Sequence, residues 1–235
     1  LVEAFGGEFM ELVIGGAPLN NEVENFLKKI EFPFTIGYGM TECAPLISYA
    51  GWEEHRKNAV GQPVFTLDVK IDSSDPQNEV GEILVKGENL FQGYYKNEQA
   101  TSKNFENGWF HTGDLGTMDK DDFIYIRGRS KNMILGPSGQ NIFPEEIESR
   151  VNNLPYVQES LVLKRENKLI ALIYPDYEAM DSEGIQEQEV RKIMEENRRK
   201  LNSNLPQYSR LNEFELYPEE FEKSPTKKIK RYLYR

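Results

Sequence analysis

A short hexapeptide carries three kinds of side chain that nucleotide chemistry requires. Residues 37–42 read Gly-Tyr-Gly-Met-Thr-Glu, which places an aromatic ring, a hydroxyl and a carboxylate in one segment with two glycines. Glycine lets a ligand approach the backbone closely because it has no side chain. An adenine ring, a phosphate and Mg²⁺ would suit Tyr38, Thr41 and Glu42 in that order. A plain turn with a buried tyrosine explains the hexapeptide equally well, so this segment alone does not decide between the two.

Two charged residues further along the chain could bind a sugar. Asp114 follows Gly113 in what reads as a loop, where its carboxylate could accept hydrogen bonds from a ribose diol. Arg129 offers a guanidinium that could reach the same sugar. Aspartates are common in turns, so neither residue is diagnostic by itself.

The elements around these residues predict a strand, a helix and a second strand. Residues 8–14 are apolar and β-prone and end at Gly-Gly-Ala-Pro in 15–18, and residues 34–36 restart an extended run that ends at Gly37. Between them, Asn20 or Asn21 can cap a helix. Its apolar face would comprise Val23, Phe26, Leu27 and Ile30. Because such units are nearly always parallel, both loops are expected at the carboxyl ends of neighbouring strands, where open α/β sheets bind ligands.

The remainder of the chain predicts a small β subdomain and then a compact α+β domain. Short alternating segments at 68–71, 82–85 and 123–126 indicate the β subdomain. Beyond residue 129, the pattern predicts helices from Pro144 and over 185–201, and strands near 157–163, 169–174 and 214–216. The predicted fold class is therefore α/β and α+β, with one domain over 1–129 and a second over 130–235.

Composition excludes several classes of protein. The 235 residues carry a formal net charge of −11, which disfavours a nucleic-acid partner. The single cysteine, Cys43, cannot form an internal disulfide or a cysteine-built zinc site, and its presence alone suits a cytoplasmic setting. Cys43 and His111 are interpreted as packing or surface residues, and His55 has no evident partner. Oligomeric state cannot be read from these patterns.

Seven short motifs, in order along the chain, closely resemble those of the adenylate-forming superfamily of acyl-CoA synthetases, firefly luciferase and nonribosomal peptide adenylation domains. They are Gly-Ala-Pro at 16–18, Tyr-Gly-Met-Thr-Glu at 38–42, Gly-Glu-Ile at 81–83, Thr-Gly-Asp at 112–114, Gly-Arg at 128–129, Pro-Glu-Glu-Ile-Glu at 144–148 and Lys-Lys-Ile-Lys-Arg at 227–231. The resemblance implies the C-terminal part of the family's large domain followed by its small, mobile domain.

The resemblance also implies a reaction and its substrates, ATP, a carboxylic acid and CoA. The carboxylate attacks the α-phosphate of ATP to give an acyl-adenylate, and the CoA thiol then displaces AMP. A Pro-Thr-Lys-Lys-Ile-Lys-Arg ending and the stretch from Gly136 to Glu148 most resemble the long-chain fatty acid type. These features leave open a peripheral membrane contact of the full-length enzyme.

Family roles carry over to individual positions. Ala17 and Tyr38 would line the adenine, with Gly16 and Gly37 beside the nucleotide. Thr41 would contact the phosphate and Glu42 would hold Mg²⁺, and both would take part in catalysis. Asp114 and Arg129 would bind the ribose.

The small domain would add three further roles. Many family members have Gly-Lys where this chain has Lys227-Lys228, so the resemblance places the catalytic lysine at Lys228. Gly139 and Gln140 would help to form the CoA tunnel. Lys131 would be the hinge about which the small domain swings between the two half-reactions.

One family motif is not found in this sequence. The Ser/Thr-Gly-rich phosphate loop that clasps the β- and γ-phosphates is expected upstream of Leu1, and an isolated fragment without it is expected to be inactive. Two alternatives stay open: another adenylate-forming ligase, such as an aryl-CoA or acyl-carrier-protein ligase, or a non-catalytic nucleotide- or acyl-CoA-binding module.

Overall fold

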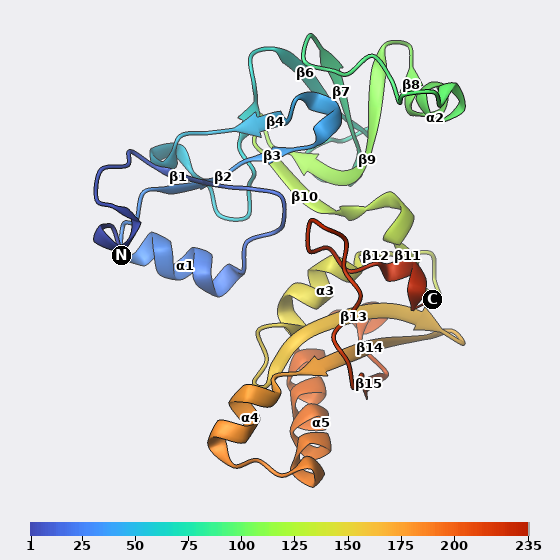
Figure 1. Ribbon diagram of the computed structural model, residues 1–235. Helices are drawn as coiled ribbons and strands as arrows, with labels where there is room; N and C mark the ends of the chain where they lie inside the picture. Colours follow the sequence, from blue (N-terminus) through green and yellow to red (C-terminus); the bar gives the residue numbers. More distant parts are fainter. Residues whose placement is uncertain (235) are drawn as a thin grey trace. The chain divides into compact units, whose positions relative to one another are not determined.

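The computed structural model describes residues 1–234, and for Glu187 the backbone only. The chain divides into two compact units, Leu1–Lys131 and Asn132–Arg235 (Figure 1). Each unit contains helices and sheets, and the predicted fold class of α/β followed by α+β is confirmed. The assignment of these units to a large domain over 1–129 and a mobile small domain over 130–235 stays a prediction.

The first unit opens with the predicted strand, helix and strand. These are β1 (Leu12–Ile14), α1 (Asn21–Lys29) and β2 (Phe34–Ile36). The two strands pair in parallel, as expected, although β1 is shorter than residues 8–14. Asn20 caps α1, because its side chain accepts hydrogen bonds from the amides of Glu22 and Val23.

The burial of α1 differs from the prediction. Val23, Phe26 and Ile30 of the expected apolar face are 42% to 52% exposed, whereas Glu24 is only 2% exposed. Glu24 contacts the ring of His55, 2.9 Å from its Oε1, so His55 does have a partner. Helical periodicity identified an apolar face correctly, but burial depends on what packs against a helix, and the pattern does not encode that.

The rest of the first unit is the predicted β-rich region. A small sheet comprises β3 (Tyr38–Gly39), β4 (Leu46–Tyr49) and β5 (Gln62–Pro63). A five-stranded antiparallel sheet comprises β6 (Leu67–Asp72), β7 (Gly81–Gly87), β8 (Phe105–Glu106), β9 (Trp109–Met118) and β10 (Ile124–Arg129), and α2 (Glu98–Asn104) precedes β8. The three strands predicted in this region correspond to β6, β7 and β10.

Asp114 lies in a strand, so its predicted loop position is wrong. It is in β9, opposite Arg129 of β10. Gly113 suggested a turn, and it does adopt a left-handed backbone conformation with φ of 72°. Pairing with both β7 and β10 nevertheless holds the segment in the middle of the sheet.

The second unit is built around a three-stranded sheet with the order β13-β14-β15. Strands β13 (Val157–Arg165) and β14 (Lys168–Pro175) form a hairpin, and β15 (Glu213–Leu216) runs parallel to β14. Glu166 and Asn167 both have positive φ, as a tight two-residue hairpin turn requires. A second, smaller hairpin pairs β11 (Ile134–Leu135) with β12 (Asn141–Ile142).

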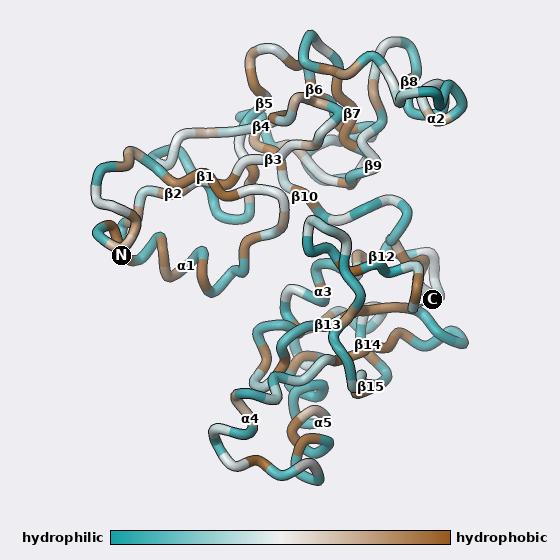
Figure 2. The backbone as a smooth tube through the Cα atoms, viewed as in Figure 1, coloured by the Kyte–Doolittle hydropathy of each residue, from teal (hydrophilic) through white to brown (hydrophobic). Residues whose placement is uncertain are grey.

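Three helices complete the second unit. Helix α3 (Pro144–Val151) begins at Pro144, α5 (Glu187–Ser203) covers the predicted charged helix, and α4 (Tyr177–Glu183) was not predicted. Proline suits the first turn of a helix because the amide it lacks would be unpaired there. Apolar residues are concentrated along β13 and β14 (Figure 2).

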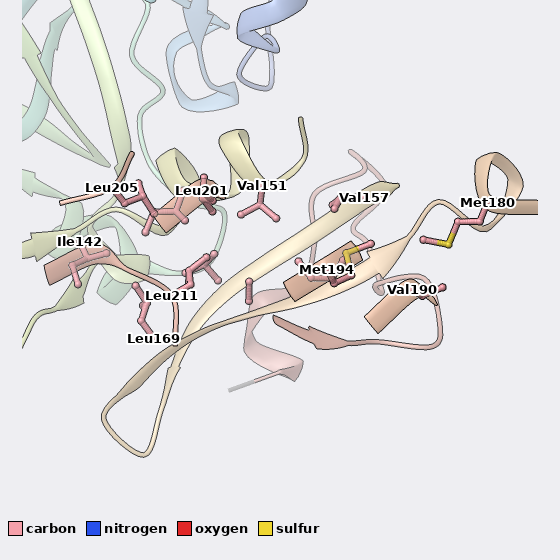
Figure 3. Close-up of a cluster of buried hydrophobic side chains, with 14 residues drawn as sticks. Ile142, Val151, Val157, Leu169, Met180, Val190, Met194, Leu201, Leu205 and Leu211 are labelled. Atoms are coloured by element: carbon pink, nitrogen blue, oxygen red, sulfur yellow. The ribbon is translucent and has the colours of Figure 1, made fainter. Parts of the chain in front are cut away.

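Both faces of this sheet are buried. One face packs with α3 and α5 into the main core, to which Val151, Val157 and Met194 contribute (Figure 3). The other face holds Leu161 and Leu172, which pack against the C-terminal segment. The alternation of side chains along a strand sends neighbouring residues to these two cores. Within residues 1–234, no helix combines the length and the apolar character needed to cross a membrane.

Candidate functional site

The predicted ligand-binding loops meet at one edge of the β1–β2 pair. The amide of Gly37 donates to the carbonyl of Ile14 at 2.9 Å, which places the loop after β1 beside the loop after β2. Gly16 and Ala17 are exposed in the first loop, and Gly37 is buried in the second. At Gly39, an added Cβ would lie 2.1 Å from the carbonyl oxygen of Pro45, so no other residue fits there.

Tyr38, Asp114 and Arg129 form one polar network. The Tyr38 hydroxyl donates to Asp114 Oδ2 at 2.7 Å, and Arg129 Nε lies 2.7 Å from Asp114 Oδ1. Burial, followed by the charge of Asp114, raises the pKa of Tyr38, so this hydroxyl stays protonated as a donor. The sequence predicted that Asp114 and Arg129 approach the same sugar, and the structure does bring these two side chains together. Both carboxylate oxygens of Asp114 are engaged, yet the side chain of Arg129 is 37% exposed.

Thr41 and Glu42 lie in a short turn, Thr41–Cys43, directly after this network. The Tyr94 hydroxyl donates to Glu42 Oε1 at 2.9 Å. Burial and this hydrogen bond raise the pKa of Tyr94 to about 12, while the positive charge of Arg129 opposes the increase. Arg129 therefore acts electrostatically on Tyr94 as well as on Asp114.

Tyr94 is a site residue that the sequence did not identify. It lies in an irregular segment between β7 and α2, far from Glu42 in the sequence. Its neighbour Phe91 donates its amide to the carbonyl of Glu42 at 2.8 Å, which fixes this segment against the turn. The only sequence signal was the run Gly93-Tyr94-Tyr95, which has no distinctive spacing.

Glu42 fits the chemistry of Mg²⁺ bound through a nucleotide. It is a partly exposed carboxylate, and Tyr94 occupies only one of its oxygens. Among residues 1–234 no group of three or more His, Cys, Asp or Glu side chains is arranged to hold a metal ion. Mg²⁺ is typically held by one or two carboxylates together with substrate phosphates, so a single carboxylate suits this role.

Lys131 and the predicted CoA residues lie at and beyond the boundary between the two units. Lys131 is in the turn Ser130–Asn132 and is the last residue of the first unit. Gly139 and Gln140 lie in the turn between β11 and β12, where Gly139 has φ of 83°. The side-chain oxygen of Gln140 is buried and has no hydrogen-bond partner among the described residues.

Lys228 lies on a loop of the second unit, residues 224–228, which we call the lysine loop. Lys227 has φ of 58°, in the left-handed region that glycine adopts most readily. The ammonium of Lys228 is exposed and, within the described part of the chain, has no ion-pair partner. By contrast, Lys223 pairs with Glu159, and Lys230 pairs with Glu222.

Comparison with known proteins shows which family this chain resembles. Residues 4–95 match the family model of the AMP-binding enzymes. A long-chain-fatty-acid–CoA ligase of Mycobacterium bovis is 35% identical over 179 residues, which is 76% of this chain and 29% of that protein. A 2-succinylbenzoate–CoA ligase of Bacillus licheniformis is 33% identical over 77% of this chain and 39% of its own length. The chain thus spans about a third of the curated relatives it matches.

Solved structures of CoA synthetases share the fold of this chain. The o-succinylbenzoate CoA synthetase of Bacillus subtilis, in complex with its acyl-adenylate intermediate, aligns with all of this chain and 49% of its own at a TM-score of 0.79 and 25% identity. The same enzyme in complex with ATP and magnesium aligns at a TM-score of 0.76 and 25% identity, over 98% of this chain and 49% of that one. The likeness extends over both units. The chain belongs to the AMP-binding enzyme family.

Proposed function

We propose that this chain is the C-terminal part of an ATP-dependent acid–CoA ligase that works through an acyl-adenylate. The observation that carries the proposal is the convergence of Tyr38, Asp114, Arg129 and the Glu42–Tyr94 pair beside the ends of two parallel strands. A nucleotide has an aromatic base, a sugar diol and a charged phosphate chain, and this edge offers a group for each of them.

The ribose and the base are assigned to the buried part of the network. Asp114 accepts from the ribose hydroxyls, and the partly exposed guanidinium of Arg129 donates to the same sugar. Gly16, Ala17, Gly37 and Tyr38 provide backbone and ring surface beside the adenine. The hydrogen bond from Tyr38 to Asp114 orients the carboxylate before the nucleotide arrives, which lowers the cost of binding.

The phosphates are assigned to Thr41 and Glu42. Thr41 is exposed and donates its hydroxyl to the phosphate, while Glu42 holds the Mg²⁺ that accompanies ATP. Mg²⁺, when bound, neutralises negative charge that accumulates on the phosphate oxygens during the attack. Tyr94 positions Glu42 by hydrogen bonding to one of its two oxygens.

Lys228 is assigned to the first half-reaction. Its ammonium bridges the substrate carboxylate and the α-phosphate, which aligns the nucleophile and counters developing charge. The left-handed backbone at Lys227 supports this register, because many family members have glycine at the position before the lysine. Gly139 and Gln140 are assigned to the CoA passage and Lys131 to the hinge, and the division of the chain directly after Lys131 supports the hinge.

A long-chain fatty acid is the substrate we propose. Long-chain-fatty-acid–CoA ligases at 34% to 39% identity are among the relatives, including one of Escherichia coli at 39%. The second candidate is an aryl acid. This chain is 33% to 34% identical to 2-succinylbenzoate–CoA ligases and covers a larger share of their length than it does of the fatty acid ligases. We propose a cytoplasmic location, with the fatty acid, ATP and CoA as partners.

An ATP–pyrophosphate exchange assay on the full-length protein that contains this chain tests the proposal. Fatty acids of increasing length and 2-succinylbenzoate would be compared at equal concentration, with a no-acid control. Exchange that increases with chain length supports the fatty acid assignment, and exchange driven by 2-succinylbenzoate alone supports the aryl candidate. Nucleotide binding without exchange for any acid would contradict ligase activity and favour a non-catalytic binding module.

A further inference from the structure

Within residues 217–234, the basic side chain with the most hydrogen bonds to the rest of the second unit is that of Arg231. Its Nη1 donates to both carboxylate oxygens of Glu148 in α3, at 2.7 and 2.8 Å. Its Nη2 donates to the carbonyl of Val162 in β13 at 2.7 Å. The side chains of Arg231 and Glu148 are only 17% and 12% exposed. Two nitrogens of one guanidinium thus join the C-terminal segment to a helix and a strand.

This contact completes a free strand edge. Strand β13 has one neighbour, β14, so the opposite edge carries unpaired backbone groups. Glu148 accepts from the amide of Val162 at 2.6 Å, and Arg231 donates to the carbonyl of the same residue. The side chains of Glu148 and Arg231 therefore provide the hydrogen bonds that a neighbouring strand would make at Val162. Loss of either would leave buried polar groups without a partner, which is more costly than the loss of a surface pair.

The lysine loop is followed by Arg231, and the residues on both sides of the loop pack against the sheet. Lys223 and Ile229 form a bridge across its base, and the amide of Ser224 donates to the carbonyl of Lys228 at 2.8 Å. Ile229, Phe221 and Tyr234 pack on the face of the sheet opposite the main core. Arg231 follows Lys228 by three positions, so the place of its guanidinium limits where the loop can lie.

We infer that Arg231, through Glu148, is a positioning residue that fixes the lysine loop and so sets where the Lys228 ammonium can reach. The inference rests on the proposed role of Lys228 in adenylation. An exposed lysine on a loose loop would sample many positions, and alignment of the reacting groups is lost by displacements of about 1 Å. A mostly buried anchor that contacts both oxygens of Glu148 next to the loop restricts that sampling.

Other ion pairs of the segment are more exposed than Arg231–Glu148. At the base of the loop, Lys223 pairs with Glu159, and these side chains are 28% and 26% exposed. Lys230 pairs with Glu222, but these side chains are 30% and 59% exposed. Solvent and salt screen exposed pairs, which contribute little to holding a loop. Among the ion pairs that the described residues form around this loop, Arg231–Glu148 is the one that is mostly buried and in which the arginine contacts both carboxylate oxygens.

The first test uses amide hydrogen exchange on the 235-residue chain, and does not depend on activity. Arg231→Gln should speed exchange at the amides of Ser224 and Lys230, which donate across the segment, by on the order of tenfold or more. Exchange in strand β14 should not change, which verifies folding. The matched control is Arg165→Gln, because Arg165 pairs with Glu215 and these side chains are 50% and 45% exposed. Unchanged exchange at both reporter amides would overturn the inference.

The second test separates the two half-reactions in the full-length protein. Arg231→Gln should slow adenylation by on the order of 10- to 100-fold while thioester formation from supplied acyl-adenylate is retained. Arg231→Lys, which keeps the charge but loses the fork, should fall between this variant and the parent. Lys228→Ala is run alongside. If Lys228→Ala slows adenylation and Arg231→Gln does not, the positioning inference is wrong; if Lys228→Ala has no effect, the proposed function of the lysine is wrong instead.

Discussion

At the scale of single residues, Asp114 combines two tasks in one carboxylate. It accepts from Tyr38 and pairs with Arg129 in the protein alone, and the proposal adds ribose hydroxyls as further partners. An ionised carboxylate has about four acceptor positions, so it can accept from a ligand hydroxyl as well as from protein donors. Under the proposed function, the network would orient this carboxylate before the nucleotide binds.

Asp114→Asn in the full-length protein should weaken ATP binding by on the order of 1.5 to 3 kcal/mol, because a charged acceptor is lost. Isothermal titration with ATP measures the change. Asp68→Asn serves as the control, since Asp68 is an exposed residue of β6 in the same sheet. Equal affinities for the parent and Asp114→Asn would contradict the ribose assignment. A thermal melt of each variant distinguishes lost binding from lost folding.

The sequence predicted that Asp114 and Arg129 would lie close together, but it predicted only part of the geometry around them. Glycine at 113 suggested a turn, and the aspartate after it was placed in a loop, although strand pairing on both sides keeps it extended. The Tyr94–Glu42 contact could not be predicted, because it joins residues that are distant in sequence through an irregular segment. Motif order therefore identified most of the candidate residues, while tertiary contacts decide which of them touch.

Glu148 is a buried carboxyl whose titration is coupled to stability. Burial raises its pKa to about 7, although Arg231 and the amide of Val162 favour the ionised form and Glu145 opposes it. In the unfolded chain the same carboxyl titrates near 4.5. The native state therefore binds the proton more tightly than the unfolded state does, and the associated stability is lost as pH rises from about 4.5 through 7.

The pH prediction is measured with Glu148→Gln. Chemical denaturation of the 235-residue chain at several pH values should show that the parent loses up to about 3 kcal/mol relative to this variant between pH 4.5 and 8. Glu166→Gln, at the exposed hairpin turn, is the control and should parallel the parent. A constant difference between the parent and Glu148→Gln over the same range would show that this carboxyl does not titrate as described.

At the scale of elements, the helices and strands followed from local patterns wherever those patterns were strong. Pro144 set the start of α3, and Glu166-Asn167 set the hairpin between β13 and β14. The face that each element buries was harder to predict. For α1 the apolar stripe is exposed and Glu24 is buried beside His55, because burial is decided by neighbouring elements.

The turn Ser130–Asn132 is the element at which the chain divides, and the hinge prediction belongs to it. Lys131→Pro in the full-length protein should slow thioester formation more than adenylation, since proline fixes φ and limits the swing between conformations. Lys131→Ala is the control, because it removes the side chain and keeps the backbone free. Single-turnover measurement of each half-reaction would reveal the difference. An equal loss in both steps, or none, would place the pivot elsewhere.

At the scale of the whole molecule, the chain consists of two compact units. The first unit holds the network of Tyr38, Asp114 and Arg129, and the second carries Gly139, Gln140 and Lys228. Motif order in the sequence predicted the family and the fold class, because both depend on many residues, whereas the acyl substrate depends on a few pocket residues.

The most direct test of the central proposal is the effect of Lys228→Ala on the two half-reactions of the full-length protein. Adenylation, followed by ATP–pyrophosphate exchange, should fall by on the order of 10² to 10³, because one preorganised electrostatic donor is removed. Thioester formation from supplied acyl-adenylate should persist. Lys227→Ala, at the exposed neighbour, and Lys230→Ala should change little. If Lys228→Ala leaves adenylation intact while Lys227→Ala or Lys230→Ala abolishes it, the assignment of the catalytic lysine is wrong.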